Sequence, residues 1–457
     1  MNESTTLVSK QFTGCATLAA IGIKLRALNV FQPIQQTVQI AQKTIKDSPI
    51  DKLYDALISL LAGAHGLVEI NTRLRADGAL QRAFGRSRCA EQSVVQDTLN
   101  ACTPANVQQM EQALDTIYRQ HSQGFQHDYQ ASFQVLDVNM SGLPCGPKAA
   151  FATKGYFAKQ RNRRGRQLGR VLASHYEEIV VDRLFDGKTQ LTRALQPLIL
   201  AAEATLQLDE DQRRRTIVRM DAGGGSLDDV NWLLTRGYLV HGKDYSGQQA
   251  KRLAKSVVDW YADPHQPERE FGWVSETTDA YVRPVKRIAV RCRQQDGKFA
   301  YGVLISTLSA QHVLTLTGQS LSVLDDPAAV LLAYLRFYDQ RGGGVETSFK
   351  GDKQGLGLGK RSKKRFAAQQ MVMLLGSLAH NVIVWARHWL ASPALHHYGT
   401  VRKVRDVFHI SGFLLTDACG QVAQIVLNQT APLASALVHP LRNLLACAHV
   451  AVNLGQT

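Results

Sequence analysis

The segment YDQRGGGVETSFKGDK, at positions 338–353, sets one carboxylate among several side chains that bind anions. Tyr338 and Arg341 precede a run of three glycines, and Glu346 and Lys353 follow it. Tyrosine, arginine and lysine donate hydrogen bonds to phosphate oxygens, whereas a glutamate among them is suited to bind a metal ion. The combination indicates a site that handles a polyanion, and the rest of the chain has to indicate which one.

Two further acids follow segments that read as β-strands. In SFQVLDVNMSG, Phe133 and Val135 alternate with polar residues and lead to Asp137. In TIVRMDAGGGSLDDVNWLLTRGYLVHGK (216–243), the pattern predicts a strand, then Asp221, a glycine-rich turn, a helix and a second strand. Open α/β sheets place their sites at the carboxyl ends of strands, so both acids are candidates for a site.

Together Asp137, Asp221 and Glu346 could bind two divalent ions. Magnesium and manganese prefer carboxylate oxygens, and two such ions about 3.5–4 Å apart can hold the attacking and leaving oxygens of a phosphodiester. With 38 Asp and Glu in the chain, however, a single acid at the end of a strand is more often a turn or cap residue. If a helix begins after Gly344, Glu346 and Lys353 lie two turns apart on one face.

A nucleotide-binding Walker loop does not fit the same region. Counting back from Gly359 and Lys360, the first glycine of the motif would fall at Gln354, and Arg361 stands where Ser or Thr is needed. The basic run 360–365, which contains Lys360 and Arg361, is better explained by contact with phosphate.

Charge points to the same partner. The chain has 53 Lys and Arg against 38 Asp and Glu, a formal charge of +15, which favours a nucleic-acid or membrane-surface partner. The segment KQRNRRGRQLGR (159–170) concentrates this charge, and we expect Arg163, Arg164 and Arg166 to contact phosphate. Seven widely spaced cysteines without a C-x-x-C pair argue for free thiols in a reducing compartment and against zinc.

No secretory signal opens the chain. The apolar segment 371–390 is interrupted by His380, Asn381, Arg387 and His388, so it predicts a buried helix rather than a membrane span. We therefore expect a cytoplasmic protein that does not act at a membrane.

The remaining elements are predicted from periodicity and cap signals. Residues 1–128 favour an all-helical domain, with helix starts at Ser48-Pro49 and Thr103-Pro104. The polar helix at 91–100 could be part of a helix-turn-helix reader or simply a surface helix. Further segments are strands at 177–182 and near 407–415, a β-rich stretch over 244–330 and a last helix within 431–454.

These motifs, taken in order, resemble the cut-and-paste DDE transposases of bacterial insertion sequences. The resemblance covers nearly the whole chain: the helical start, LDVNMSGLPCG, KGYFAKQRNRRGRQLGR, RMDAGGG, a β-rich insertion and a Tyr-Arg-Glu-Lys signature. It implies a ribonuclease-H-like core in which Asp137, Asp221 and Glu346 bind two Mg²⁺ (or Mn²⁺). It also implies that the signature residues Tyr338, Arg341 and Lys353 contact the DNA of the transposon end.

One spacing departs from that family. Four residues separate Arg341 from Glu346, where the family has three. We expect the glycine run to absorb the extra residue as a bulge, because glycine tolerates φ > 0. The β-rich stretch falls where the family carries an insertion that helps to hold the DNA end. There, Trp273 could stack on a base, but such a residue is more often part of the core.

We thus predict an α/β fold in which a β-rich insertion interrupts a ribonuclease-H-like catalytic core, preceded by an all-helical domain. The predicted divisions are a helical DNA-binding domain 1–128, core 129–243, insertion 244–330, core with the glutamate-bearing helix 331–395, and a C-terminal segment 396–457. The predicted function is that of a DNA transposase, acting as a homodimer on double-stranded transposon ends and target DNA in the bacterial cytoplasm, associated with the nucleoid. The alternatives are a recruited or inactive transposase that only binds DNA, and another ribonuclease-H-like nuclease.

Overall fold

The structure of this 457-residue chain is a computed structural model, and it describes residues 7–43, 46–155, 157, 160 and 162–456. The chain divides into two compact units. Unit 1 comprises Met1–Ser122, Leu143–Arg166 and Phe349–Thr457, and unit 2 comprises Gln123–Gly142 and Gln167–Ser348. The predicted insertion 244–330 therefore lies within unit 2, and the predicted C-terminal segment 396–457 within unit 1. The division into five domains stays a prediction.

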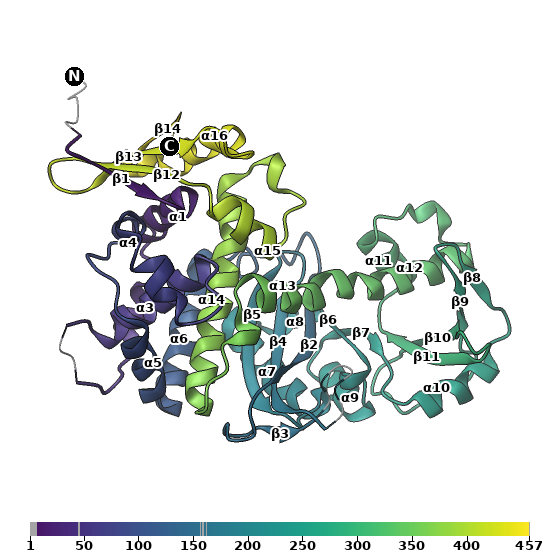
Figure 1. The fold of residues 1–457 in the computed structure, drawn as a ribbon. Coiled ribbons are helices and arrows are strands. Elements are labelled where there is room, and N and C mark those ends of the chain that lie inside the picture. Colours follow the sequence, from purple (N-terminus) through teal and green to yellow (C-terminus); the bar gives the residue numbers. More distant parts are fainter. Residues whose placement is uncertain (1–6, 44–45, 156, 158–159, 161, 457) are drawn as a thin grey trace. The chain divides into compact units, whose positions relative to one another are not determined.

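Five neighbouring strands form the part of the unit 2 sheet that bears the predicted acids (Figure 1). Their order is β5-β4-β2-β6-β7, and β6 runs parallel to both β2 and β7. The first residues of β4 and the last of β2 belong to unit 1. The strands are β2 (Gln134–Pro144), β4 (Arg164–Ala173), β5 (Glu178–Asp186), β6 (Thr216–Met220) and β7 (Leu239–Lys243).

The unit around Asp221 has the predicted order of strand, turn, helix and strand. After β6 comes a short 3-10 turn, η2 (Ala222–Gly224), then α9 (Leu227–Thr235), which Ser226 caps by accepting from the Asp229 backbone N–H. Gly225 has a specific reason to be glycine, since a Cβ there would lie 2.0 Å from the Lys243 carbonyl oxygen of β7. The connection from β5 to β6 contains α7 (Leu191–Leu206) and α8 (Glu210–Arg214).

The predicted β-rich stretch extends the same sheet. β11 pairs antiparallel with β7, and β10, β9 and β8 follow in order, which confirms the predicted β10–β11 hairpin. Trp273 packs against the core of unit 2, with its ring 5.6 Å from that of Tyr334, as its more common role suggested. The elements are β8 (Tyr261–Asp263), β9 (Gln266–Trp273), β10 (Lys286–Arg293), β11 (Phe299–Ser306), α10 (Gly247–Leu253), η3 (Ala254–Ser256), α11 (Ala310–Leu316) and η4 (Leu321–Val323).

The signature segment lies on three consecutive helical elements. These are α12 (Pro327–Arg341), the π-helix η5 (Gly342–Glu346) and α13 (Thr347–Gly355). The prediction of a helix starting after Gly344 is wrong, because α12 begins at Pro327 and η5 continues it. The predicted bulge with φ > 0 is also wrong: Gly342 is helical at φ −61°, and the wider π turn accommodates the extra residue.

Unit 1 is built around the long helix α14 (Phe366–Leu390), which packs against α3, α5, α6 and α16 (Figure 1). This helix is long and apolar enough to cross a membrane, but 94% of its most apolar window is buried, which confirms the predicted buried helix. Its other helices are α1 (Ala16–Ala27), α2 (Gln32–Thr37), α3 (Pro49–Leu61), η1 (Ile70–Leu74), α4 (Gly78–Ala83), α5 (Gln92–Ala101), α6 (Pro104–His121), η6 (Leu358–Lys360), η7 (Pro393–Leu395), α15 (Thr400–Arg402), η8 (Lys403–Phe408), α16 (Ala434–Leu445) and η9 (Ala446–Ala448).

A four-stranded sheet of unit 1 corrects two predictions. Its order is β1 (Ser9–Thr13), β12 (Gly412–Thr416), β13 (Val422–Asn428) and β14 (Ala451–Gly455). The amino-terminal region is therefore not entirely helical, and the final helix ends before a parallel strand. Both strands pair with distant segments, so local periodicity alone does not reveal them. A further short strand, β3 (Thr153–Lys154), pairs with the start of β4.

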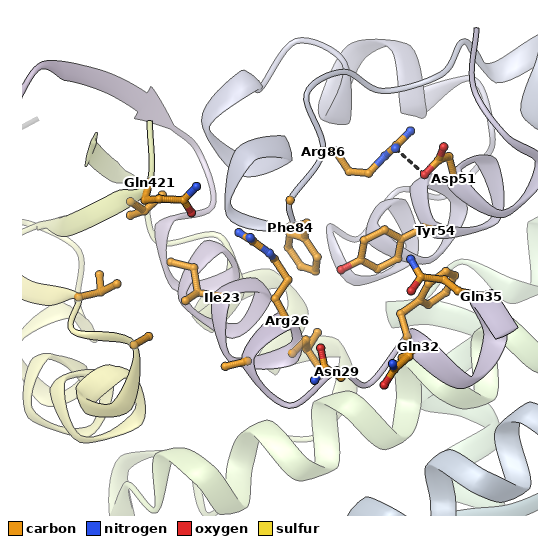
Figure 2. Close-up of a pocket in the computed structure, with 17 residues that line it drawn as sticks. Ile23, Arg26, Asn29, Gln32, Gln35, Asp51, Tyr54, Phe84, Arg86 and Gln421 are labelled. Atoms are coloured by element: carbon orange, nitrogen blue, oxygen red, sulfur yellow. Dashed lines mark ion pairs between the residues drawn. The ribbon is translucent and has the colours of Figure 1, made fainter. Parts of the chain in front are cut away.

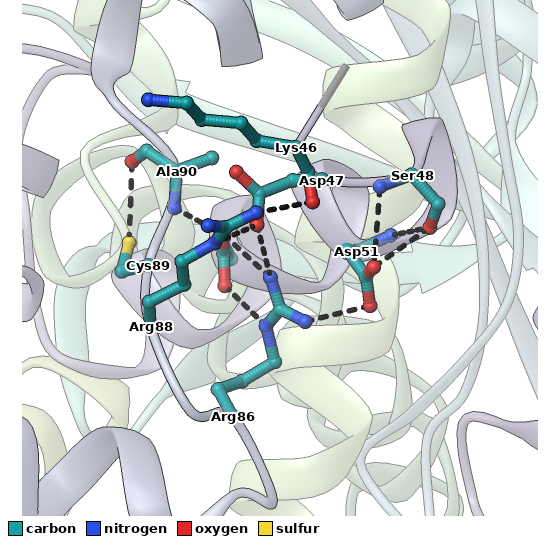
Figure 3. A network of polar contacts seen from close by, with 9 residues as sticks. Lys46, Asp47, Ser48, Asp51, Arg86, Arg88, Cys89 and Ala90 are labelled. Carbon is teal, nitrogen blue, oxygen red and sulfur yellow. Dashed lines mark hydrogen bonds and ion pairs between the residues drawn. The ribbon is translucent and has the colours of Figure 1, made fainter. Parts of the chain in front are cut away.

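Both predicted helix starts in unit 1 are confirmed. Ser48 caps α3 and forms a capping box with Asp51, and Thr103 caps α6 in the same way with Asn106. Figure 3 shows how the α3 start is held: Arg86 forms ion pairs with Asp51, at 2.7 Å, and with Asp55, at 2.9 Å. Burial raises the pKa of the fully buried Asp55 carboxyl, while its hydrogen bond from Arg86 opposes that rise.

Candidate nucleic-acid interface

The carboxylate of Asp137 is fully buried and already has a partner. Arg219, directly opposite it on β6, donates from Nε to Oδ1 at 2.6 Å and from Nη2 to Oδ2 at 2.9 Å. The third nitrogen of Arg219 donates to the Phe337 carbonyl of α12. On its other side Asp137 faces η5, where a Cβ on Gly344 would lie 2.8 Å from Oδ2. Both oxygens are therefore enclosed between β6 and the signature helix.

The carboxylate of Asp221 is half-buried at the end of β6, where Oδ1 accepts from the Gly223 backbone N–H at 2.9 Å. The parallel register pairs Val138 with Met220. Continuing it by one residue places Asn139, rather than Asp137, across from Asp221. Asn139 is 8% exposed, and its side-chain oxygen accepts from the Met140 backbone N–H at 2.8 Å.

The signature residues of unit 2 gather beside Asp221. Arg341 has a side chain only 7% exposed and donates from Nη2 to Glu346 Oε1 at 2.6 Å, while 52% of the Glu346 side chain is exposed. The guanidinium carbon of Arg341 lies 5.6 Å from the centre of the Tyr338 ring. Burial is the main cause that raises the pKa of Tyr338; Arg341 opposes this rise, and the charges of Asp221 and Glu346 add to it.

Two nitrogens of Arg341, Nε and Nη1, are buried and have no hydrogen-bond partner among the described residues. Guanidinium groups buried in native proteins normally satisfy their N–H donors, since leaving one unpaired costs about 1–3 kcal/mol. The side chain is thus held for a partner that the chain itself does not supply.

The residues present do not fit a two-metal site. Within the described part of the chain, no group of three or more His, Cys, Asp or Glu is arranged to hold a metal ion. Both oxygens of Asp137 accept from Arg219, which leaves Asp221 and Glu346 as the accessible acids of the predicted three.

Sequence reasoning missed three residues at this face: Arg219, Asn139 and His241. His241 is fully buried, and its Nδ1 lies 3.1 Å from the Ser306 hydroxyl. Burial lowers the pKa of His241 to about 3, and the charge of Arg219 lowers it further. Alternation along the predicted strand was the signal for Arg219, since residues 219 and 221 share one face of a strand.

The predicted basic loop divides into exposed and buried residues. Arg163 and Arg164 are exposed, and Arg164 donates to the Ala152 carbonyl at 3.2 Å. Arg166 is 1% exposed and donates to three backbone carbonyls, so the expected phosphate contact by Arg166 is corrected to a structural role. Lys159 and Arg161 lie outside the described residues.

The second basic run alternates in the same manner. Lys360 is exposed, but Arg361 is 4% exposed and donates to the Ala64 carbonyl. Burial lowers the pKa of Arg361 to about 10. Its predicted DNA contact is therefore corrected to a structural role within unit 1, while Lys353 is half-buried on α13.

Two cavities of unit 1 are separate from the predicted residues. One, of about 690 Å³, is shown in Figure 2, where Arg26, Gln32 and Tyr54 lie around an opening that also meets Gln421. The other, of about 470 Å³, carries more cations than acids. Its charged lining residues are Lys43, Lys46, Lys52, Arg75 and Arg88, with Asp47 and Glu91.

Comparison with known proteins is of limited help. No protein-family profile and no curated protein sequence matches the chain. One solved structure, the piggyBac transposase synaptic complex with hairpin DNA, aligns over 95% of this chain and 84% of that chain, with a TM-score of 0.44 and 11% identity. At that TM-score the likeness does not establish a shared fold.

Proposed function

We propose that this chain is a DNA transposase, which binds the ends of a mobile element, cuts them and joins them to target DNA. The observation that carries the proposal is Arg341, a buried guanidinium with two unpartnered N–H groups. Phosphate accepts from two such donors at once, in the geometry that guanidinium presents. Tyr338 lies beside it, and because burial raises its pKa it stays a protonated donor at neutral pH.

The arrangement of unit 2 supports this role. Strand order β5-β4-β2-β6-β7, with helices leading into β6 and β7, is the order expected of the proposed ribonuclease-H-like core. The order sets the carboxyl ends of β2 and β6 side by side, and Arg219 links them to α12. Net charge of +15 would add a salt-dependent attraction to DNA.

Mg²⁺ or Mn²⁺ is the proposed cofactor; when bound, it would stabilise charge on phosphodiester oxygens. Asp221 and Glu346 are the two acids of the predicted three that are accessible to it. Since Asp137 is paired with Arg219, the arrangement supports phosphate binding more fully than metal binding.

A second candidate function follows from that pairing: a transposase-derived protein that binds DNA without cutting it. The bidentate Asp137–Arg219 pair is the observation that favours it. In either case two element ends have to be held together, so we propose a homodimer on DNA, acting in the cytoplasm on nucleoid DNA. Sedimentation of the protein with end DNA would test the dimer.

The test uses purified protein and labelled duplexes with the inverted ends of its own element, beside a scrambled duplex. Specific binding, followed in Mg²⁺ by cleavage at the element boundary that Glu346→Ala abolishes, would support the transposase. Specific binding without cleavage would support the second candidate. Equal affinity for both duplexes would contradict both.

A further inference from the structure

We propose that Asn139, not Asp137, occupies the first metal-ligand position of this site, so that the chain lacks one of the carboxylates that a two-metal site needs. The inference deepens the proposed function and rests on it. It identifies the chain as a DNA-binding protein with a depleted metal site.

The first step is that Asp137 is committed elsewhere. Its side chain is 0% exposed, both oxygens accept from Arg219, and the latter is itself only 3% exposed. A metal ion could take Asp137 only by displacing Arg219, which would leave a buried guanidinium charge without its counter-ion. Gly344 covers the remaining approach, because even a Cβ at that position would come within 2.8 Å of Oδ2.

The second step is the register of the two strands. Asp137 is paired with Arg219, and Asn139 and Asp221 each lie two residues further along in the same direction. Side chains two residues apart share a face, and adjacent strands are about 4.7–4.9 Å apart. Asn139 therefore neighbours Asp221 on the same face as the Asp137–Arg219 pair. Asp221 itself has an extended backbone, φ −83° and ψ −176°, which continues the strand.

The same face is the one that carries the signature helix. Arg219 contacts the Phe337 carbonyl of α12, and the charges of Asp221 and Glu346 both act on Tyr338. Position 139 thus belongs to the side of the sheet that also holds Asp221 and Glu346, at the end of the strand, whereas position 137 lies deeper beneath the helix.

The third step is the chemistry of the side chain. An amide offers a neutral oxygen, and that of Asn139 already accepts from the Met140 backbone N–H. Mg²⁺ and Mn²⁺ favour anionic oxygen, and ligand charge strongly tunes their affinity. With Asn at this position, Asp221 and Glu346 would hold a divalent ion weakly.

The test measures Mn²⁺ binding in the absence of DNA, by electron paramagnetic resonance titration and by the shift of thermal unfolding with Mn²⁺. The wild type is compared with Asn139→Asp and with Asn139→Ala, which changes the same position without adding charge. We expect Asn139→Asp to bind Mn²⁺ at least about tenfold more tightly than either of the others. DNA binding, measured separately, should persist in all three, so a failure of the proposed function is distinguishable from a failure of this inference.

Asp137 provides the opposing arm. Asp137→Asn, or Asp137→Asn with Arg219→Gln if the single variant does not fold, should leave Mn²⁺ affinity within about twofold of the wild type. Equal Mn²⁺ affinity in Asn139→Asp and Asn139→Ala would overturn the inference. Tight Mn²⁺ binding by the wild type that the Asp137 variants abolish would also overturn it.

Discussion

The docking of the π-helix η5 on the sheet can be tested at two adjacent glycines. A Cβ on Gly344 would lie 2.8 Å from Asp137 Oδ2, whereas a Cβ on Gly343 meets nothing within 4 Å. Both residues are in the same helical turn. Alanine should therefore gain the same helix propensity at either position, about 1 kcal/mol relative to glycine, and only Gly344→Ala should meet an obstacle.

The obstacle is the carboxylate of a buried ion pair rather than the end of a flexible side chain. Adding a methyl group to so well-packed a place typically costs about 1–3 kcal/mol. Because the gain in propensity cancels between the two variants, Gly344→Ala should be less stable than Gly343→Ala by roughly that amount. Gly343→Ala itself should be at least as stable as the wild type.

The assay is urea unfolding of wild type and both variants, followed by circular dichroism and by tryptophan fluorescence. Trp273 packs in the core of unit 2 near α12, so its fluorescence should respond to the docking of that helix. Equal free energies of unfolding for the two alanine variants would refute the contact between η5 and Asp137. So would a stabilisation by Gly344→Ala.

Three further predictions concern stability, pH and salt. Asp137→Asn should lower the free energy of unfolding by about 3–5 kcal/mol, a shift in Tm of roughly 6–20 °C in calorimetry, and Arg219→Gln in the same chain should recover part of it; a Tm within 2 °C, on the order of the smallest shift such a loss allows, would contradict the buried pair. His241 stays neutral when folded, with a pKa of about 3, but binds a proton below about pH 6.5 when unfolded, so stability should fall with decreasing pH over that window. His241→Gln should remove about 1.4 kcal/mol per pH unit of that dependence in urea titrations, and an unchanged slope would argue against its burial. If the basic cavity of unit 1 contacts DNA, Lys43→Gln with Arg75→Gln should reduce the slope of log K against log salt by about 0.9 for each phosphate lost, and an unaltered slope would exclude it.

Local signals in the sequence account for much of the fold around Asp221. The Ser226 cap, the glycine turn and the flanking apolar runs each act within a few residues, and the structure has the strand, helix and strand that they predict. The starts of α3 and α6 are equally local, because a capping residue and a following proline are sufficient to mark them.

The details of the site depend on contacts that are distant in sequence. The partner of Asp137 is 82 residues away, and only the register of two parallel strands brings Arg219 opposite it. The π turn depends on how the helix is docked, since three glycines are compatible with several backbone conformations. Arg166 and Arg361 lie in basic runs that resemble solvated faces, and their burial follows from backbone carbonyls supplied by distant segments.

The most direct test of the account is the DNA affinity of an Arg341→Gln variant. Fluorescence anisotropy with the element's own end duplex would compare it with the wild type and with Arg336→Gln, which removes an arginine from the same helix. Because a charge-assisted hydrogen bond contributes about 1.5–3 kcal/mol, Arg341→Gln should weaken binding at least about tenfold, with Arg336→Gln within about twofold of the wild type. Adding Glu346→Gln to Arg341→Gln should not restore affinity, if the loss reflects a missing phosphate contact rather than an unpaired carboxylate. Equal affinity of the wild type and Arg341→Gln would contradict the account.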